Sequence, residues 1–134
     1  MTGPGRRSLG QRGEEAAVAL LTSKGYHIIA RNWRPGRRAT RDVRGELDIV
    51  ARDGATWVFV EVRARRSRAY GTPEESITPR KARQLVALAW AYLQDQGLED
   101  ADWRIDVVAL AMTADGRVLH ANHIEHAVTG AEDV

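Results

Sequence analysis

Two neighbouring apolar segments, each carrying a carboxylate, limit most strongly what this chain can fold into. The segments are 45–50 (GELDIV) and 58–63 (VFVEVR), and an Asp-Gly dipeptide lies between them. Both segments predict β-strands, and Asp-Gly predicts a tight hairpin turn that pairs them. Such pairing would bring Asp48 and Glu61 close together in the middle of a sheet. Two like charges in a half-buried place destabilise the fold unless a proton or a cation neutralises them.

The segments around this hairpin predict further helices and strands. Apolar residues at helical spacing predict a helix over 10–24, and a Thr-Pro start predicts a second helix over 78–96. Strand patterns occupy 26–30, 104–112 and 117–120. Because the second helix separates two strands, it can serve as the crossover that makes them parallel neighbours. We therefore predict an α/β domain with a central mixed β-sheet of about five strands flanked by helices.

Length and composition predict one domain and exclude several classes of protein. The chain has 134 residues and no cysteine, so disulfides and thiolate metal sites are excluded. We expect a disordered basic N-terminal tail over 1–8, a single domain over 9–126 and a C-terminal tail over 127–134. No stretch is long and apolar enough to predict a membrane span, and no apolar segment follows the basic N-terminus as in a secretory signal. We therefore expect a cytoplasmic protein without membrane contact.

The charges are unevenly distributed along the chain. The formal net charge is +2, yet residues 31–83 contain 14 Lys or Arg against 7 Asp or Glu, and nearly all of these cations are arginine. Arginine can bind phosphate through two parallel hydrogen bonds, so a basic middle predicts a nucleic-acid partner. A compositional bias toward arginine would produce the same excess without any such partner. The loop arginines expected to hold a nucleic-acid backbone are Arg37, Arg38, Arg65, Arg66 and Arg68.

Strand alternation and helical spacing predict where the charged side chains point. Asp48, Glu61 and Arg63 should share one face of the sheet, opposite an apolar face that the helices cover. Lys81 begins the core-facing stripe of the second predicted helix, so its amine can reach a carboxylate at a strand end. Glu14 is the better placed of the acidic residues in the first predicted helix to point inward.

These residue types predict a site for a divalent cation. Carboxylate oxygens suit Mg²⁺ or Mn²⁺, and Asp48 and Glu61 are the predicted metal ligands. A metal held there would polarise a phosphoryl oxygen and lower the pKa of a bound water. The alternative is a structural ion network between the two carboxylates and the surrounding arginines.

Two other polar patterns predict structural roles. Arg104 and Asp106 share one face of an apolar strand and predict an ion pair. His120, His123 and His126 recur at helical spacing, but their place after an edge strand and near the chain end favours a surface position over a metal site.

Several motifs, in this order and spacing, resemble those of the YraN family of bacterial proteins. The matching motifs are Gly13-Glu14, 45–50, 59–63, Gly71, Lys81 and 104–108. That family is similar to restriction-endonuclease-like nucleases, including archaeal Holliday-junction resolvases, whose site contains a helix Glu, a strand Asp and a Glu-x-Lys motif. The resemblance implies a restriction-endonuclease-like fold with a nuclease site at Glu14, Asp48, Glu61 and Arg63.

One residue departs from the implied nuclease motif. Arg63 replaces its lysine, and because arginine stays protonated it cannot accept a proton from water. We hypothesise that Lys81 supplies this role. The resemblance implies a Mg²⁺-dependent endonuclease acting on DNA, including branched or flapped DNA, and by analogy with junction-cutting enzymes a homodimer. Two alternatives are a catalytically silent nucleic-acid-binding module of the same fold and a protein that contacts other proteins or ribosomal RNA.

Overall fold

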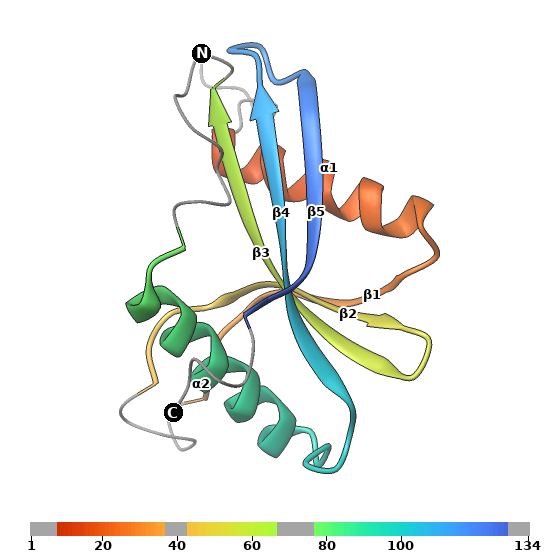
Figure 1. The fold of residues 1–134 in the computed structure, drawn as a ribbon, viewed down its shortest axis with the longest axis vertical. Coiled ribbons are helices and arrows are strands. Elements are labelled where there is room, and N and C mark those ends of the chain that lie inside the picture. The colour runs from red at the N-terminus through yellow and green to blue at the C-terminus, as the bar shows by residue number, and fades with distance from the viewer. Residues whose placement is uncertain (1–7, 37–42, 67–76, 129–134) are drawn as a thin grey trace.

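One five-stranded sheet with a helix on each face forms the protein in a computed structural model that describes residues 8–36, 43–66 and 77–128 (Figure 1). In chain order the elements are α1 (Leu9–Ser23), β1 (His27–Trp33), β2 (Leu47–Asp53), β3 (Thr56–Arg66), α2 (Pro79–Asp95), β4 (Trp103–Met112) and β5 (Val118–Val128). The strands lie in the order β1-β2-β3-β4-β5, with β3 and β4 parallel and the other neighbours antiparallel. The predicted α/β class, the mixed sheet and the parallel pairing across α2 are therefore confirmed.

Both helices begin at residues whose side chains cap them. The Ser8 hydroxyl accepts a hydrogen bond from the backbone N–H of Gln11 at 3.1 Å, and the Gln11 side chain accepts one from the N–H of Ser8 at 3.0 Å. In α2 the Thr78 hydroxyl accepts from the N–H of Lys81 at 3.1 Å, and Pro79 occupies the first helical position. The cap therefore fixes Lys81 in the first turn of α2. Neither of the two helices described is long and apolar enough to cross a membrane.

The hairpin of β2 and β3 opens into a fork at one end. A two-residue turn joins the strands, and its first residue, Gly54, has the positive φ of 63° that such a turn favours. Pairing of the two strands ends at Ile49 and Val60, and the same register places Asp48 opposite Glu61. Beyond that point β2 pairs only with β1, whereas β3 continues alongside β4. The strands therefore separate where the two acidic residues lie.

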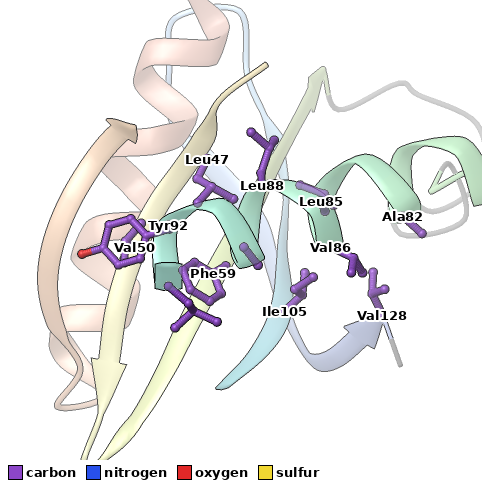
Figure 2. Packing of buried hydrophobic residues seen from close by; sticks show 12 residues of the cluster. Leu47, Val50, Phe59, Ala82, Leu85, Val86, Leu88, Tyr92, Ile105 and Val128 are labelled. Carbon is purple, nitrogen blue, oxygen red and sulfur yellow. The ribbon is translucent and has the colours of Figure 1, made fainter. Parts of the chain in front are cut away.

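Both faces of the central strands β2, β3 and β4 are buried, each beneath one helix. The core on the α2 face (Figure 2) consists mainly of Leu47, Val50, Phe59, Leu85, Leu88, Tyr92 and Ile105. The core on the α1 face consists mainly of Ala17, Leu21, Ile49, Val58, Val60, Val108 and Leu110. The expectation of one helix-covered apolar face opposite an acidic face is therefore wrong. The paired residues next to the fork, 49–51 of β2 and 58–60 of β3, are apolar and buried on both sides, and Asp48 and Glu61 stand where this pairing ends.

The last strand is longer than its sequence pattern predicts. β5 spans 11 residues, Val118–Val128, rather than 117–120, and it pairs along β4 with two irregularities of register. These irregularities and a polar composition hide the two-residue alternation that marks a strand. Val128 is buried against the core on the α2 face. The domain therefore continues past residue 126, into the stretch expected to be a C-terminal tail.

Gly13 allows α1 to lie close to β3. A Cβ atom at Gly13 would stand 2.6 Å from the Cβ of Ala64, which is shorter than van der Waals contact permits. We expect Gly13→Ala to lower the free energy of unfolding by about 1–3 kcal/mol, because the helix must move away from the sheet. Urea denaturation measures this loss. Gly10→Ala in the same helix, where the new methyl meets only the Ser8 hydroxyl at 3.9 Å, should be neutral or stabilising, and equal losses in both variants would contradict the prediction.

Candidate active site at the fork of the sheet

Asp48 and Glu61 occupy the fork from adjacent strands. Where β2 leaves β3, the Asp48 carboxylate takes the place of a strand partner and accepts a hydrogen bond from the N–H of Val62 at 2.8 Å. Glu61 lies opposite on β3, and its side chain is only 7% exposed. The negative charge of Glu61 acts on the Asp48 carboxyl and raises its pKa. The fork therefore brings together the two residues predicted to bind a metal.

Two cations lie beside Glu61. Its Oε2 atom is 3.6 Å from Arg63 Nε on the same strand and 3.6 Å from Lys81 Nζ on α2. The Lys81 contact follows from the helical stripe, since Leu85 and Leu88 on the same side of α2 are buried in the core. Arg63 and Lys81 thus reach the same carboxylate oxygen from different elements.

The environment of Asp48 favours its protonated form. Burial contributes most and the negative charge of Glu61 contributes next, and together they raise the pKa of Asp48 to about 7. The Val62 N–H opposes this rise, and the charge of Glu14 adds to it. The ion pairs with Arg63 and Lys81 are made by Glu61. A carboxyl group that titrates near neutrality at the edge of an open pocket is typical of functional sites.

Glu14 enters the same pocket from α1. The pocket has a volume of about 380 Å³ and is lined by Gly10, Glu14, Asp48, Val62, Arg63, Ala64 and Arg65. Two residues of β1 hold Glu14. Arg31 Nη2 lies 3.6 Å from one carboxylate oxygen, and Asn32 Nδ2 donates to the other at 3.0 Å. The close approach of α1 to the sheet at Gly13 thereby places Glu14 in the pocket of Asp48.

The donor set at the fork suits a hard cation that keeps part of its water shell. Within residues 8–36, 43–66 and 77–128, no three His, Cys, Asp or Glu side chains are grouped closely enough to hold a metal ion. Asp48 and Glu61 therefore offer two carboxylates, and Mg²⁺ is commonly bound through one or two carboxylates with water filling the other positions. A cation there would also relieve the repulsion that raises the pKa of Asp48. Glu14 is engaged by Arg31 and Asn32, which suits the positioning of water better than metal ligation.

The arginines predicted to bind a nucleic-acid backbone are only partly described. Arg65 lines the pocket at the fork, and Arg66 ends β3 beside it; both are exposed. Three others lie outside the described residues: Arg37, Arg38 and Arg68.

A further set of cations lies around the start of α2 and was not predicted from the sequence. It comprises Arg44, Arg80 and Arg83. Their charge is visible in the sequence, but only the fold brings the segment before β2 next to the first turns of α2.

A second polar cluster is buried between β4, β5 and the end of α1. Asp106 is fully buried and accepts hydrogen bonds from Arg104 Nε at 3.0 Å and from His123 Nε2 at 2.8 Å. Lys24 donates to the other ring nitrogen of His123 at 2.9 Å, and Arg104 donates to the Tyr26 hydroxyl at 2.7 Å. The predicted Arg104–Asp106 ion pair is confirmed. The expected surface position of His123 is wrong, because its pairing with Asp106 leaves its side chain only 2% exposed, while the other two histidines of that pattern are exposed.

The fold and the fork define a small α/β protein with a carboxylate pair at a break in its sheet. A model of the uncharacterised protein family UPF0102 matches residues 13–110, and the chain belongs to that family. A member from Symbiobacterium thermophilum is 46% identical over 112 residues, which cover 84% of this chain and 89% of the relative. A member from Pelotomaculum thermopropionicum is 45% identical over 122 residues, which cover 91% and 96% respectively. The resemblance to the YraN family is thereby confirmed as family membership.

Proposed function

We propose that this protein is a metal-dependent, endonuclease-like enzyme that hydrolyses phosphodiester bonds of DNA at the fork of its sheet. The observation that carries the proposal is the Asp48–Glu61 pair, in which the pKa of Asp48 is raised to about 7 beside an open pocket, with Arg63 and Lys81 nearby. A divalent cation stabilises such a pair, and a cation flanked by positive side chains suits a phosphodiester. The resemblance to restriction-endonuclease-like nucleases supports the same activity, with branched or flapped DNA as substrates.

Each residue at the fork has a distinct part in this proposal. Asp48 and Glu61 would hold Mg²⁺ or Mn²⁺, and a metal bound there would polarise a phosphoryl oxygen and lower the pKa of a bound water. Arg63 and Lys81 place positive charge where negative charge develops on the phosphate. Glu14 orients water in the pocket that it shares with Asp48. Because Arg63 stays protonated, Lys81 is the one of these two cations able to exchange a proton.

A divalent metal should raise the melting temperature of the wild-type protein. A ligand at 100 times its Kd stabilises the folded state by about 2.7 kcal/mol, so Mg²⁺ or Mn²⁺ in that excess should shift the melting temperature measurably at pH 8. Glu61→Gln should lose the shift, because it removes one of the two carboxylates. Asp100→Asn, in the exposed turn between α2 and β4, should keep it. An equal shift in all three proteins would show that the metal binds elsewhere.

Replacement of Lys81 by methionine should reduce metal-dependent cleavage by about 10²–10³-fold, because it removes a positive charge that stabilises the negative charge developing on the phosphate. The measurement is cleavage of linear, nicked and four-way DNA in the presence of Mn²⁺. The variant should retain the metal-induced shift in melting temperature, since Asp48 and Glu61 remain. Wild-type rates in the variant would refute the assigned role of Lys81.

One observation favours a second candidate function, a catalytically silent nucleic-acid-binding module. Arg63 stands where the resembling nucleases carry lysine, and Lys81 approaches Glu61 from a different element. Salt-dependent DNA binding by the wild-type protein without cleavage of any substrate would support this module. The absence of DNA binding would support contact with another protein or with ribosomal RNA. Sedimentation of the same samples tests the homodimer expected by analogy.

A further inference from the structure

We infer that a second, basic pocket at the start of α2 holds the DNA backbone next to the phosphodiester at the fork, an inference that rests on the proposed function. This pocket has a volume of about 490 Å³ and is lined by Val43, Arg44, Thr78, Arg80, Lys81, Arg83, Gln84 and Ala87. Half of these eight residues are cations and none is acidic, so the ligand class is a polyanion. None of the ion pairs in the described part of the chain involves Arg44, Arg80 or Arg83, whose positive charges are therefore available to a ligand.

Lys81 connects this pocket to the fork. Its side chain lines the basic pocket, and its Nζ atom lies 3.6 Å from Glu61 Oε2. Successive phosphates of one strand are about 3.4 Å apart along a duplex axis, so a strand that has one phosphate at the fork and runs past Lys81 would bring its next phosphates to the basic pocket. A free anion would need only one of the two places, whereas a nucleic-acid backbone spans both. This continuity identifies the polyanion as the strand that the fork cleaves.

The basic pocket is also held in shape by the chain itself. Gln84 Nε2 on α2 donates to the backbone carbonyl of Arg44 at 2.8 Å, which ties the segment before β2 to the helix. Gly45 has a φ of 102°, and a Cβ atom at this position would clash with the Gln84 side chain. Val43 and Ala87 are partly buried and give the pocket an aliphatic floor. The backbone of Arg44 is therefore held beside the cations of α2, which distinguishes the pocket from an ordinary solvated helix face.

The test is the salt dependence of DNA binding by the double variant Arg80→Gln/Arg83→Gln. Fluorescence anisotropy with labelled duplex and four-way DNA, without metal, gives the slope of log K against log salt concentration. Each lost phosphate contact lowers the magnitude of this slope by about 1, so the double variant should lose about 2 relative to wild type. Arg52→Gln is the matched control, because the Arg52 guanidinium lies over the Trp57 ring at the other end of β2, and it should retain the wild-type slope. An unchanged slope in the double variant, or no DNA binding by wild type, would overturn the inference.

Metal-dependent melting and cleavage, measured on the same proteins, separate this inference from the proposed function. The double variant should keep the metal-induced shift, and saturating DNA should restore its cleavage rate, because the residues at the fork are unchanged. A reduced slope together with no metal effect and no cleavage in wild type would sustain the pocket and refute the enzyme. Cleavage by wild type with an unchanged slope in the double variant would refute the pocket and sustain the enzyme.

Discussion

Asparagine in place of Asp48 is expected to stabilise the protein at pH 8 and to have little effect at pH 4. In the folded protein the pKa of this carboxyl is raised to about 7, against an ordinary value of 3.8. Between these values the folded state binds more protons than the unfolded state, so the free energy of unfolding falls as the pH rises through this window. Above pH 7 the cost of the charged carboxylate reaches about 4 kcal/mol at most, at about 1.36 kcal/mol per pKa unit. Asparagine carries no such charge.

The substitution preserves the other contacts of Asp48. The asparagine side-chain oxygen can accept the hydrogen bond from the Val62 N–H, as the Asp48 carboxylate does. The change in stability should therefore report the removed charge. Urea denaturation of wild type and variant at pH 4 and pH 8 measures it, with the exposed Asp100→Asn as the control at both values. An equal difference between wild type and Asp48→Asn at both pH values would show that Asp48 does not titrate near neutrality.

At pH 8 a divalent cation should stabilise the wild-type protein, as the Asp48→Asn substitution does. At pH 8 the metal should stabilise the protein that retains Asp48 and should leave the Asp48→Asn variant unchanged, because the variant lacks both the repulsion and the ligand. A residue whose removal stabilises the empty protein and abolishes the metal effect is retained for function despite its cost in stability. Stabilisation without any metal dependence would instead indicate a structural carboxyl pair.

Local sequence patterns were sufficient to predict that Asp48 and Glu61 lie opposite each other, but not that the two strands separate at this point. Two-residue alternation in 45–50 and 58–63, with Asp-Gly between them, places Asp48 opposite Glu61, because both the register and the direction of side chains are set within one hairpin. Helical spacing likewise predicts that Lys81 faces the sheet, because the cap at Thr78 fixes where the helix begins. These relations involve short separations along the chain or a single regular element.

Long-range packing was not visible in the same patterns. The strands at the centre of a mixed sheet are apolar on both faces, so alternation alone could not show that α1 and α2 cover opposite sides. The sequence predicts only the first residues of β5, because the rest of the strand is polar. One of these polar residues, His123, is buried by pairing with Asp106 on β4, which no local pattern shows. No local pattern predicts the basic pocket either, because the contact between Gln84 and Arg44 joins segments 40 residues apart.

Asp106 provides the opposite case to Asp48, because its charge is already neutralised within the fold. Burial is the largest single influence and would raise the pKa of Asp106, but hydrogen bonds from His123 and Arg104 together outweigh it and hold the pKa below the ordinary value. Removal of the carboxylate would leave the buried Arg104 with only two largely exposed anions, Asp53 at 3.3 Å and Glu125 at 3.8 Å. We therefore expect Asp106→Asn to lower the free energy of unfolding by about 3–5 kcal/mol at pH 7.

The pH dependence and an apolar double variant test this account of Asp106. Because the folded-state pKa is depressed, the stabilisation is present above the unfolded-state value of about 3.8 and is lost as the pH falls through the folded-state value, so the deficit of Asp106→Asn should shrink on acidification. Arg104→Met/Asp106→Leu removes both charges and should be less destabilised than Asp106→Asn at pH 7, because no isolated charge remains from the pair. Urea denaturation at pH 7 and pH 3 measures both effects. A double variant as unstable as Asp106→Asn would show that the two side chains stabilise the fold through packing. The metal-induced shift in melting temperature should persist in Asp106→Asn, because Asp48 and Glu61 are unchanged.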